Sequence, residues 1–281
     1  TNEVVVHNEK RKSGNSGSHS PHQDQDDDHV CLKCVPLSDQ DTIIELSNEV
    51  QIMQQCIHEH IVRFYSACVF EKSLWISMEY CTHGSLTNLI SHPSIRLTEP
   101  QIASICRQVL QGLQYLHQDR LIIHRDIKSD NILISERYEM KISDFGLSVQ
   151  CKSPTETHSA CVGTPFWVAP EMIQQSCQYN SKVDLWSLGI VVWEMVHHGE
   201  PPHFNVQDSN QVLNTIAFKP APRLTGDAYS ADFKDFVSGL LCKTPQQRMS
   251  ASQALKHEFI RSAKQKPSDF LPQLFAQLQS R

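Results

Sequence analysis

The sequence lacks several features that would mark whole classes of protein. Its most apolar stretch, Leu185 to Val196, is well short of the ~20 residues that a membrane-spanning helix needs. No secretory signal precedes the first predicted strand, and no Asn-x-Ser/Thr acceptor for glycosylation occurs. The net charge of −6 lacks the basic excess of nucleic-acid-binding proteins. We therefore expect a cytoplasmic protein that neither spans a membrane nor binds nucleic acid.

The ten cysteines lack regular spacing, which favours reduced thiols over a disulfide framework. Cys31 and Cys34, with Cys56, His58 and His60 downstream, raise the alternative of a zinc site. However, Cys31 and Cys34 lie in a predicted strand, where residues three apart point to opposite faces. We therefore favour structural cysteines over zinc ligands.

With 281 residues, of which 40% are hydrophobic, the chain is long enough for one large domain or two lobes that share an interface. Strands are predicted at Val4 to Val6, at Val30 to Val35 and in two segments between Ile61 and Tyr80. Between Asp41 and Gln55, apolar residues at 43, 46, 50 and 53 predict a helix. The first third should therefore be a strand-rich unit with one helix.

The remaining two thirds are predicted to be mainly helical, with the boundary near residues 81–84. Thr98 and Gln101 form a capping box at the start of one helix. A second apolar helix is expected at Val183 to Val196, and further amphipathic helices follow it. The helix that begins at this capping box carries its apolar side chains on one stripe, at Ile102, Ile105, Val109, Leu113 and Leu116.

The clearest chemical pattern lies in two loops that follow short apolar strands. The stretch IIHRDIKSDNILI, from Ile122 to Ile134, holds Asp126, Lys128 and Asn131, and MKISDFGLS holds Asp144. A carboxylate such as Asp126 could accept a proton from an attacking hydroxyl. Lys128 could neutralise charge on a transferring phosphate. Asn131 and Asp144 offer the oxygen ligands that Mg²⁺ prefers.

Each short motif can arise by chance, but HRDIKSDN, DFG and GTPFWVAPE (Gly163 to Glu171) occur in this order within about fifty residues, as in protein kinases. Together with EYCTHGSL and KVDLWSLGIVVWEM, they make the chain resemble a eukaryotic serine/threonine protein kinase of the STE group, most like its PAK branch. The resemblance implies an α+β, bilobal kinase domain over residues 1–281. Its N-lobe would cover residues 1–82, its C-lobe 83–270, and a C-terminal helix 271–281.

The resemblance implies a role for each matching residue. Asp126 would be the catalytic base, Lys128 its helper on the phosphate side, and Thr164 would help to place the substrate hydroxyl. Asn131 and Asp144 would bind Mg²⁺. ATP would be bound by Lys33 with its ion-pair partner Glu49, by the gatekeeper Met78, by the hinge from Glu79 to Cys81, and by Leu133 beneath the adenine. Glu171 would pair with Arg248, and a stacked spine of Met53, Phe64, His124 and Phe145 would be anchored by Asp184.

The glycine-rich loop departs from the family pattern. By family spacing it falls on Lys12 to His19, where Gly14 and Gly17 remain. Lys12 replaces the first glycine, and His19 replaces the valine that covers the adenine. Pro21 and four aspartates follow, which disfavour a returning strand and would repel phosphate. We expect a weakened ATP lid in which Lys12 offers charge to the phosphates, and a flexible linker is the alternative.

The activation segment, Asp144 to Glu171, also departs from the family pattern. Ala160 stands where the family usually has a phosphorylatable threonine, although Thr157 and Ser159 are close by. We therefore do not expect the usual switch by loop phosphorylation.

We predict a non-specific serine/threonine protein kinase that uses ATP and Mg²⁺ on protein substrates. By resemblance, Asp130 and Glu194 would present acidic groups to substrate arginines, so the target serine should follow basic residues. The alternative is a pseudokinase scaffold, which the altered loop supports and the complete catalytic set disfavours. The chain begins with Thr1 rather than Met. We therefore expect a fragment, and a Rho-type GTPase partner would bind through a segment outside it.

Overall fold

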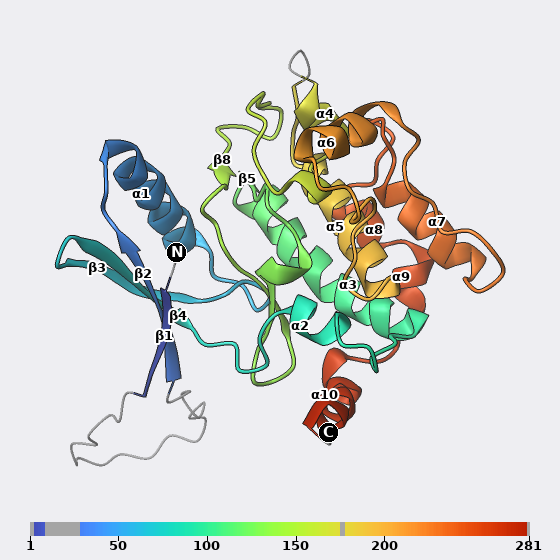
Figure 1. The fold of residues 1–281 in the computed structure, drawn as a ribbon, viewed down its shortest axis with the longest axis horizontal. Helices are drawn as coiled ribbons and strands as arrows, with labels where there is room; N and C mark the ends of the chain where they lie inside the picture. Colours follow the sequence, from blue (N-terminus) through green and yellow to red (C-terminus); the bar gives the residue numbers. More distant parts are fainter. Residues whose placement is uncertain (1–2, 9–28, 175–177, 280–281) are drawn as a thin grey trace.

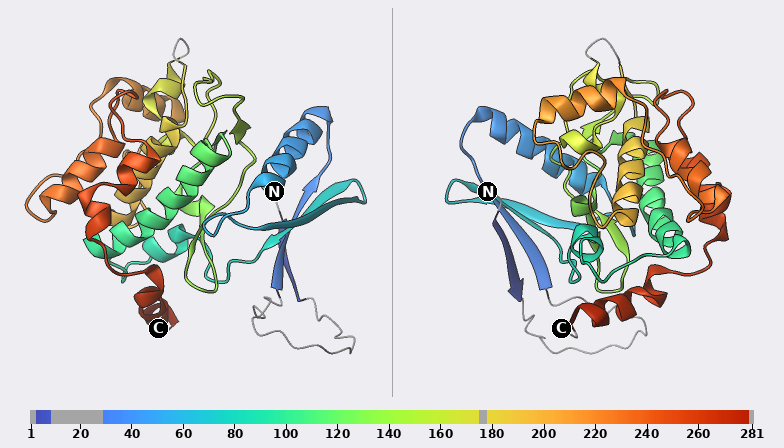
Figure 2. Two further views of the ribbon diagram at one scale, coloured as in Figure 1. Left: turned by 180° about the vertical axis from the view of Figure 1, so that it is seen from behind. Right: turned by 45° about the vertical axis from the view of Figure 1, so that its right-hand side comes forward.

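A strand-rich part and a larger helical part lie side by side in the computed structural model, which describes residues 3–8, 29–174 and 178–279 (Figures 1 and 2). The strand-rich part is an antiparallel sheet in the order β1-β2-β4-β3, accompanied by helix α1. The bounds of these elements are β1 Glu3–Asn8, β2 His29–Pro36, α1 Gln40–Gln55, β3 Phe64–Phe70 and β4 Ser73–Glu79. The predicted strands and the predicted helix of the first third are confirmed.

Helix α1 begins at a well-defined cap and buries one face. The Asp39 side chain accepts a hydrogen bond from the Thr42 backbone N–H at 2.8 Å, which satisfies one free donor of the first turn. Leu46, Ile52 and Met53 are buried, and Glu49 is buried on the same helix. A buried carboxylate needs a charged partner, so Glu49 must lie next to a positively charged side chain.

The helical part is built around two helices. The apolar stripe of α3 is buried, and the predicted capping box of Thr98 and Gln101 is present at its start. Helix α5 is buried along nearly all of its length, as expected for a helix that is apolar all round. The helices are α2 Leu86–Ile90, α3 Glu99–Gln114, a π-helical turn Tyr115–Asp119, α4 Pro170–Ile173, α5 Lys182–Val196, α6 Ser209–Phe218, α7 Ala231–Leu240, α8 Ala251–Leu255, α9 Glu258–Ser262 and α10 Leu271–Gln279.

Two short antiparallel pairs place the loops that carry the chemical motifs. Strand β5 (Ile122–Ile123) pairs with β8 (Val149–Gln150), and β6 (Ile132–Ile134) pairs with β7 (Met140–Ile142). The chain therefore leaves β5 into the HRD loop and leaves β7 into the DFG loop on the side that faces the sheet. The predicted α+β, bilobal architecture is confirmed.

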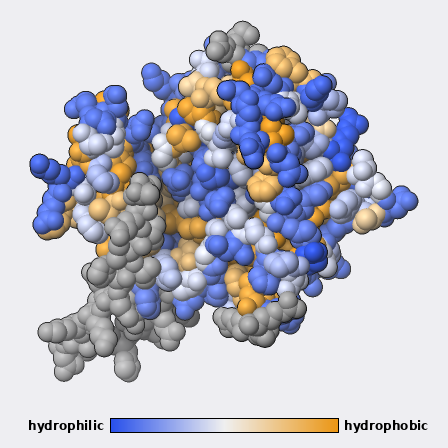
Figure 3. Space-filling view, in the orientation of Figure 1, coloured by the Kyte–Doolittle hydropathy of each residue, from blue (hydrophilic) through white to orange (hydrophobic). Residues whose placement is uncertain are grey.

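Within the described residues, no helix is both long and apolar enough to cross a membrane. The surface in Figure 3 is mostly polar, with apolar residues exposed on the strand-rich part at the left of the view. The exposed apolar side chains there include Ile44 on α1 and Val69 and Phe70 on β3.

Candidate active site

Four side chains of the catalytic loop and the activation segment form one hydrogen-bonded cluster. Asp126 Oδ1 accepts from the Thr164 hydroxyl at 2.6 Å, and Asp126 Oδ2 accepts from Asn131 Nδ2 at 2.9 Å. Lys128 Nζ lies 2.9 Å from both Asp126 Oδ2 and the Thr164 hydroxyl. The structure thus brings together the predicted base, its lysine helper, the predicted substrate-positioning threonine and one predicted metal ligand.

The protonation of Asp126 follows from these contacts. Burial by itself would raise the pKa of the carboxyl, but the hydrogen bonds from Thr164 and Lys128 and the Lys128 charge hold this pKa below its ordinary value. Asp126 is therefore an anion at neutral pH, directed at Thr164 in the segment that follows the DFG loop.

A second charged group joins the sheet, α1 and the DFG loop. Lys33 Nζ on β2 lies 2.7 Å from Glu49 Oε1 on α1 and 3.7 Å from Asp144 Oδ1. Burial would lower the pKa of Lys33, but the carboxylates of Glu49 and Asp144 raise it above its ordinary value. The lysine is held charged, and the carboxylate of Asp144 remains half exposed, at 47% of the side chain.

Buried Asp184 on α5 fixes the backbone of the HRD loop. Its Oδ2 accepts from the His124 N–H at 2.9 Å and its Oδ1 from the Arg125 N–H at 2.8 Å. His117 Nε2 donates to the same carboxylate at 2.7 Å. Burial would raise the pKa of Asp184, but His117 and the loop lower it. The sequence did not reveal His117, because no spacing links the π-helical turn after α3 to α5.

The His124 ring links the two motif loops. Its Nδ1 accepts from the Asp126 N–H at 3.3 Å, so Nε2 carries the proton that it donates to the Ser143 carbonyl at 3.0 Å. The rings of His124 and Phe145 are 5.1 Å apart in an edge-to-face arrangement. Both rings are fully buried, Met53 is buried, and Phe64 packs against the same core.

Backbone conformation brings the activation segment to the catalytic loop. Gly163 has φ +113°, and a Cβ there would lie 2.7 Å from the Arg125 carbonyl oxygen. Only glycine permits this approach, which sets Thr164 against Asp126. Arg125 and Asp144 adopt left-handed φ values of 67° and 64° without being glycine. Such conformations are costly and persist where neighbouring contacts impose them.

The predicted pair of Glu171 and Arg248 forms a buried bidentate ion pair, with N–O distances of 2.6 and 2.9 Å. Arg248 also donates to the carbonyls of Cys242 and Lys182. Its guanidinium lies 5.3 Å from the ring centre of Trp186. All three guanidinium nitrogens therefore have partners. The ion pair joins the APE segment, Ala169 to Glu171, to the loop before α8.

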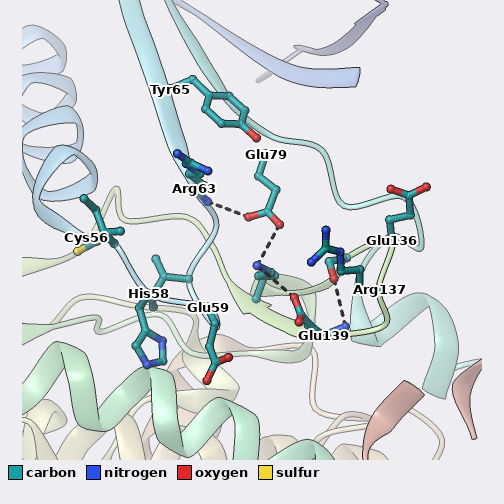
Figure 4. A pocket seen from close by; sticks show the side chains of 13 residues that line it. Cys56, His58, Glu59, Arg63, Tyr65, Glu79, Glu136, Arg137 and Glu139 are labelled. Carbon is teal, nitrogen blue, oxygen red and sulfur yellow. Dashed lines mark hydrogen bonds and ion pairs between the residues drawn. The ribbon is translucent and has the colours of Figure 1, made fainter. Parts of the chain in front are cut away.

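The predicted hinge, Glu79 to Cys81, begins at the last residue of β4. Met78 faces Cys31 and Phe64 across the sheet, Cys81 is buried, and half-buried Leu133 lies on β6. The Glu79 side chain points into a cavity of about 600 Å³, where its carboxylate binds Lys141 at 3.0 Å and the Arg63 N–H at 3.0 Å (Figure 4). Because this carboxylate is engaged, only the backbone of Glu79 is left for a nucleotide.

That cavity is separate from the candidate active site, since neither Lys33, Asp126 nor Asp144 lines it. Its lining mixes acidic and basic side chains, such as Glu59 and Arg137 (Figure 4). Exposed Ile57 also lines it.

Tyr179 links the activation segment to the catalytic loop. The Tyr179 hydroxyl accepts from Arg125 Nη1 at 3.1 Å and donates to the Ala160 carbonyl at 2.9 Å. A two-bond backbone bridge joins His158 to Tyr179. Tyr179 is 2% exposed. The sequence did not reveal its contacts with Arg125 and Ala160, because both residues are distant from it along the chain.

Glu194 corrects one expectation. The resemblance made it an acidic group for substrate arginines, but it is 1% exposed. Its two oxygens accept from the Ser129 hydroxyl at 2.6 Å and from Trp167 Nε1 at 2.8 Å. Burial raises the pKa of Glu194 to about 7 despite these bonds. Asp130 is exposed as expected.

Two further predictions concern other parts of the chain. Lys12, Gly14, Gly17 and His19 lie outside the described residues, so the glycine-rich loop stays a prediction.

Cys31 and Cys34 both lie on β2, as predicted, opposite Met78 and Trp75 of β4. Among the described residues, no group of three or more His, Cys, Asp or Glu side chains could hold a metal.

Comparison with known proteins identifies the family. A model described as "Protein kinase domain" matches residues 13–260. The chain belongs to the protein kinase family. It is 41% identical to serine/threonine-protein kinase dst1 of Dictyostelium discoideum, over 84% of this chain and 31% of that protein. It is 39% identical to serine/threonine-protein kinase 1 of Arabidopsis thaliana, over 87% of this chain and 29% of that protein. It is 42% identical to serine/threonine-protein kinase STE20 of Yarrowia lipolytica, over 83% of this chain and 20% of that protein.

The kinase chain spans a third or less of the length of these relatives. The comparisons confirm the predicted serine/threonine protein kinase family of the STE group. They give no support to the pseudokinase alternative.

Proposed function

We propose that this kinase domain transfers the γ-phosphoryl group of ATP to serine or threonine hydroxyls of proteins. The observation that carries the proposal is the joined cluster of Asp126, Lys128 and Thr164, with the charged Lys33 and Glu49 pair on the opposite lobe. Such a reaction needs positioning and charge stabilisation more than covalent chemistry, and both parts are in place.

Asp126 orients the substrate hydroxyl and accepts its proton. The carboxylate is fixed by three neighbours, so little orientational freedom is lost when a hydroxyl binds. Lys128 lies beside it and stabilises negative charge on the phosphoryl oxygens. Lys33, held charged by Glu49, binds the phosphates on the nucleotide side.

The donor atoms present fit Mg²⁺. Asn131 uses its amide N–H groups on Asp126, so its oxygen faces away from that bond, and the Asp144 carboxylate is half exposed. Amide and carboxylate oxygens are the ligands that Mg²⁺ prefers. Asn131 and Asp144 would hold the ion, which would neutralise charge on the phosphates.

The substrate is a serine or threonine preceded by basic residues. Exposed Asp130 beside the catalytic loop supports this preference, and buried Glu194 does not contribute an exposed charge. One exposed carboxylate contributes about 1 kcal/mol or less, so the preference is graded. A peptide array in which acidic flanks are favoured would contradict it. A Rho-type GTPase partner, binding through a segment outside these residues, belongs to the same proposal by resemblance alone.

One experiment separates the kinase from a pseudokinase. Purified protein is incubated with Mg²⁺ and γ-labelled ATP on a basic protein substrate, and nucleotide binding is followed by thermal shift. We expect labelled phosphoserine or phosphothreonine. Nucleotide binding without transfer, or no binding at all, would favour the scaffold.

Phosphatase treatment before the assay tests the control of the activation segment. The Arg125–Tyr179–Ala160 contacts already hold the segment, so the treated protein should keep its rate. Loss of activity both on treatment and in Ser159→Ala would show that Ser159 has become the switch.

A further inference from the structure

Three aromatic rings form a cluster beside the predicted hinge. The His83 ring lies 4.2 Å from the Tyr138 ring at 15° and 4.8 Å from the Phe275 ring at 32°. The Tyr138 and Phe275 rings are 6.1 Å apart. His83 is the second residue after the hinge, Tyr138 lies in the β6–β7 turn, and Phe275 lies on α10. Helix α10 lies next to that turn in Figure 1 and in the view from behind in Figure 2.

The chemistry of the three residues favours this packing. All three are half-buried. Burial lowers the pKa of His83, whose ring is also hydrogen-bonded to the Glu136 backbone, so the ring packs in its neutral form at pH 7. Tyr138 has φ +60°, a left-handed conformation that is costly for a residue with a side chain. Such a conformation persists where neighbouring contacts impose it, and the His83 and Phe275 rings supply two of them.

Backbone hydrogen bonds connect the aromatic cluster to the nucleotide side of the site. The His83 N–H donates to the Ile134 carbonyl of β6 at 3.2 Å, and the Ile134 N–H donates to the Gly84 carbonyl at 2.9 Å. Gly84, with φ +71°, donates its own N–H to the Cys81 carbonyl at 3.1 Å. Ile134 directly follows Leu133, the predicted floor beneath the adenine. Movement of His83 would therefore shift the end of the hinge relative to that floor.

The β6–β7 hairpin contacts the hinge at both of its ends. At the first end, Lys141 of β7 forms its ion pair with Glu79 at 3.0 Å. At the second end, Tyr138 of the turn packs against His83, and Phe275 of α10 packs against both rings. The second end thus depends on apolar packing with a helix that begins only at residue 271.

We propose that Phe275 is a positioning residue for ATP, because α10 acts through His83 to hold the hinge in the conformation that binds the adenine. The inference rests on the proposed kinase function. A hinge that adopts its binding conformation only part of the time binds nucleotide more weakly in proportion. The aromatic cluster raises that fraction without touching the nucleotide. It should therefore govern ATP affinity and leave the transfer step, which depends on Asp126 and its partners, unchanged.

Loss of the ring tests the proposal. Phe275→Leu keeps an apolar side chain but removes the aromatic contact, so the ATP dissociation constant and KM should rise about three- to tenfold. Calorimetry and steady-state kinetics measure the two quantities, and kcat at saturating ATP should not change. Phe275→Tyr keeps the ring and should keep wild-type affinity. His83→Leu should weaken ATP binding as Phe275→Leu does, and the double variant should be no weaker than His83→Leu alone.

Phe259→Leu is the matched control. Phe259 on α9 is 3% exposed, and its ring stacks on that of Phe233 at 4.6 Å and 17°. The same change therefore removes a similar aromatic contact from the helical part, away from the hinge. It should lower the melting temperature and leave the ATP dissociation constant unchanged. If Phe275→Leu showed this same pattern, its role would be structural and the proposal would be overturned.

The remaining outcomes are equally decisive. Wild-type protein that binds and uses ATP, together with unchanged affinity in Phe275→Leu, would overturn this inference alone. Wild-type protein that binds no ATP would overturn the proposed function and this inference with it. Equal falls in kcat and kcat/KM would assign Phe275 to the transfer step instead. Additive losses in the double variant would show that Phe275 does not act through His83, which also contradicts the proposal.

Discussion

The two sides of the candidate active site are held together to different degrees. On the helical side, Asp126 and Asp184 each have at least three hydrogen-bond or ion-pair partners, and Asp184 is fully buried. On the strand-rich side, the described residues hold Lys33 between Glu49 and Asp144. The transfer machinery is thus pre-organised by many coupled contacts. On the nucleotide side, Lys33 lies 2.7 Å from Glu49 but 3.7 Å from Asp144, whose side chain is 47% exposed. Damage should therefore have different consequences on the two sides.

The largest effect is expected on the helical side. Asp126→Asn keeps the shape of the side chain but removes the base, so turnover should fall by about 10²–10⁴-fold. The melting temperature should change little. Asp235→Asn, which alters an exposed carboxylate far from the loop, should keep wild-type turnover and serves as the control. Near wild-type turnover in Asp126→Asn would refute the proposed mechanism.

The buried pair of Glu171 and Arg248 should matter for stability. Arg248→Leu leaves Glu171 unpaired in the core, and denaturant unfolding should show a loss of about 3–5 kcal/mol. Arg261→Leu is the matched control, because its pair with Glu258 is exposed and 3.9 Å long, worth about 1 kcal/mol or less. Adding Glu171→Leu should restore part of the lost stability. Equal losses in the two single variants would mean that burial does not set the strength of these pairs.

Glu194 should give the helical part a pH dependence. Its folded-state pKa of about 7 lies above the ordinary glutamate value near 4.5. The folded form therefore binds an extra proton between these values. The stabilisation that Glu194 contributes is fully present below about pH 4.5 and is lost as pH rises through 7. The contribution of this group is about 3 kcal/mol. Glu194→Gln should flatten that part of the stability profile in urea unfolding. An unchanged slope would show that Glu194 titrates normally.

On the nucleotide side, repair of the predicted glycine-rich loop should strengthen binding. The double change Lys12→Gly and His19→Val would restore a backbone that can close over phosphates and an apolar cap above the adenine. Burial of a valine-sized group contributes roughly 1–2 kcal/mol, which is about tenfold in the ATP dissociation constant. Calorimetry should show this gain while saturating turnover stays the same. Failure of both forms to bind ATP would assign the stretch to a linker.

The smallest effect tests the link between the activation segment and the catalytic loop. Tyr179→Phe removes the hydroxyl that joins Arg125 to Ala160. A buried hydrogen-bonded group of this kind contributes about 1 kcal/mol, so turnover should fall by about fivefold. A steady-state assay at saturating ATP measures it. Tyr138→Phe, in the β6–β7 turn, where the half-buried ring stacks on His83, should keep its rate.

Several features of this kinase were readable from the sequence because they depend on local chemistry. Apolar spacing predicted α1 and α3, Thr98 and Gln101 predicted a cap, and the motif order predicted which residues meet at the site. These signals act over a few residues, where side-chain periodicity and backbone preference are decisive.

Tertiary structure alone decided the remaining features. The contact of His117 with Asp184 joins residues 67 positions apart, and that of Tyr179 with Arg125 joins residues 54 apart. The burial of Glu194, which overturned its expected exposure, depends on Ser129 and Trp167 arriving from two other segments. The open edge of β3 likewise depends on the order of strands in the sheet. The sequence therefore determined which chemical groups are available, and packing between distant segments determined their charge, exposure and partners.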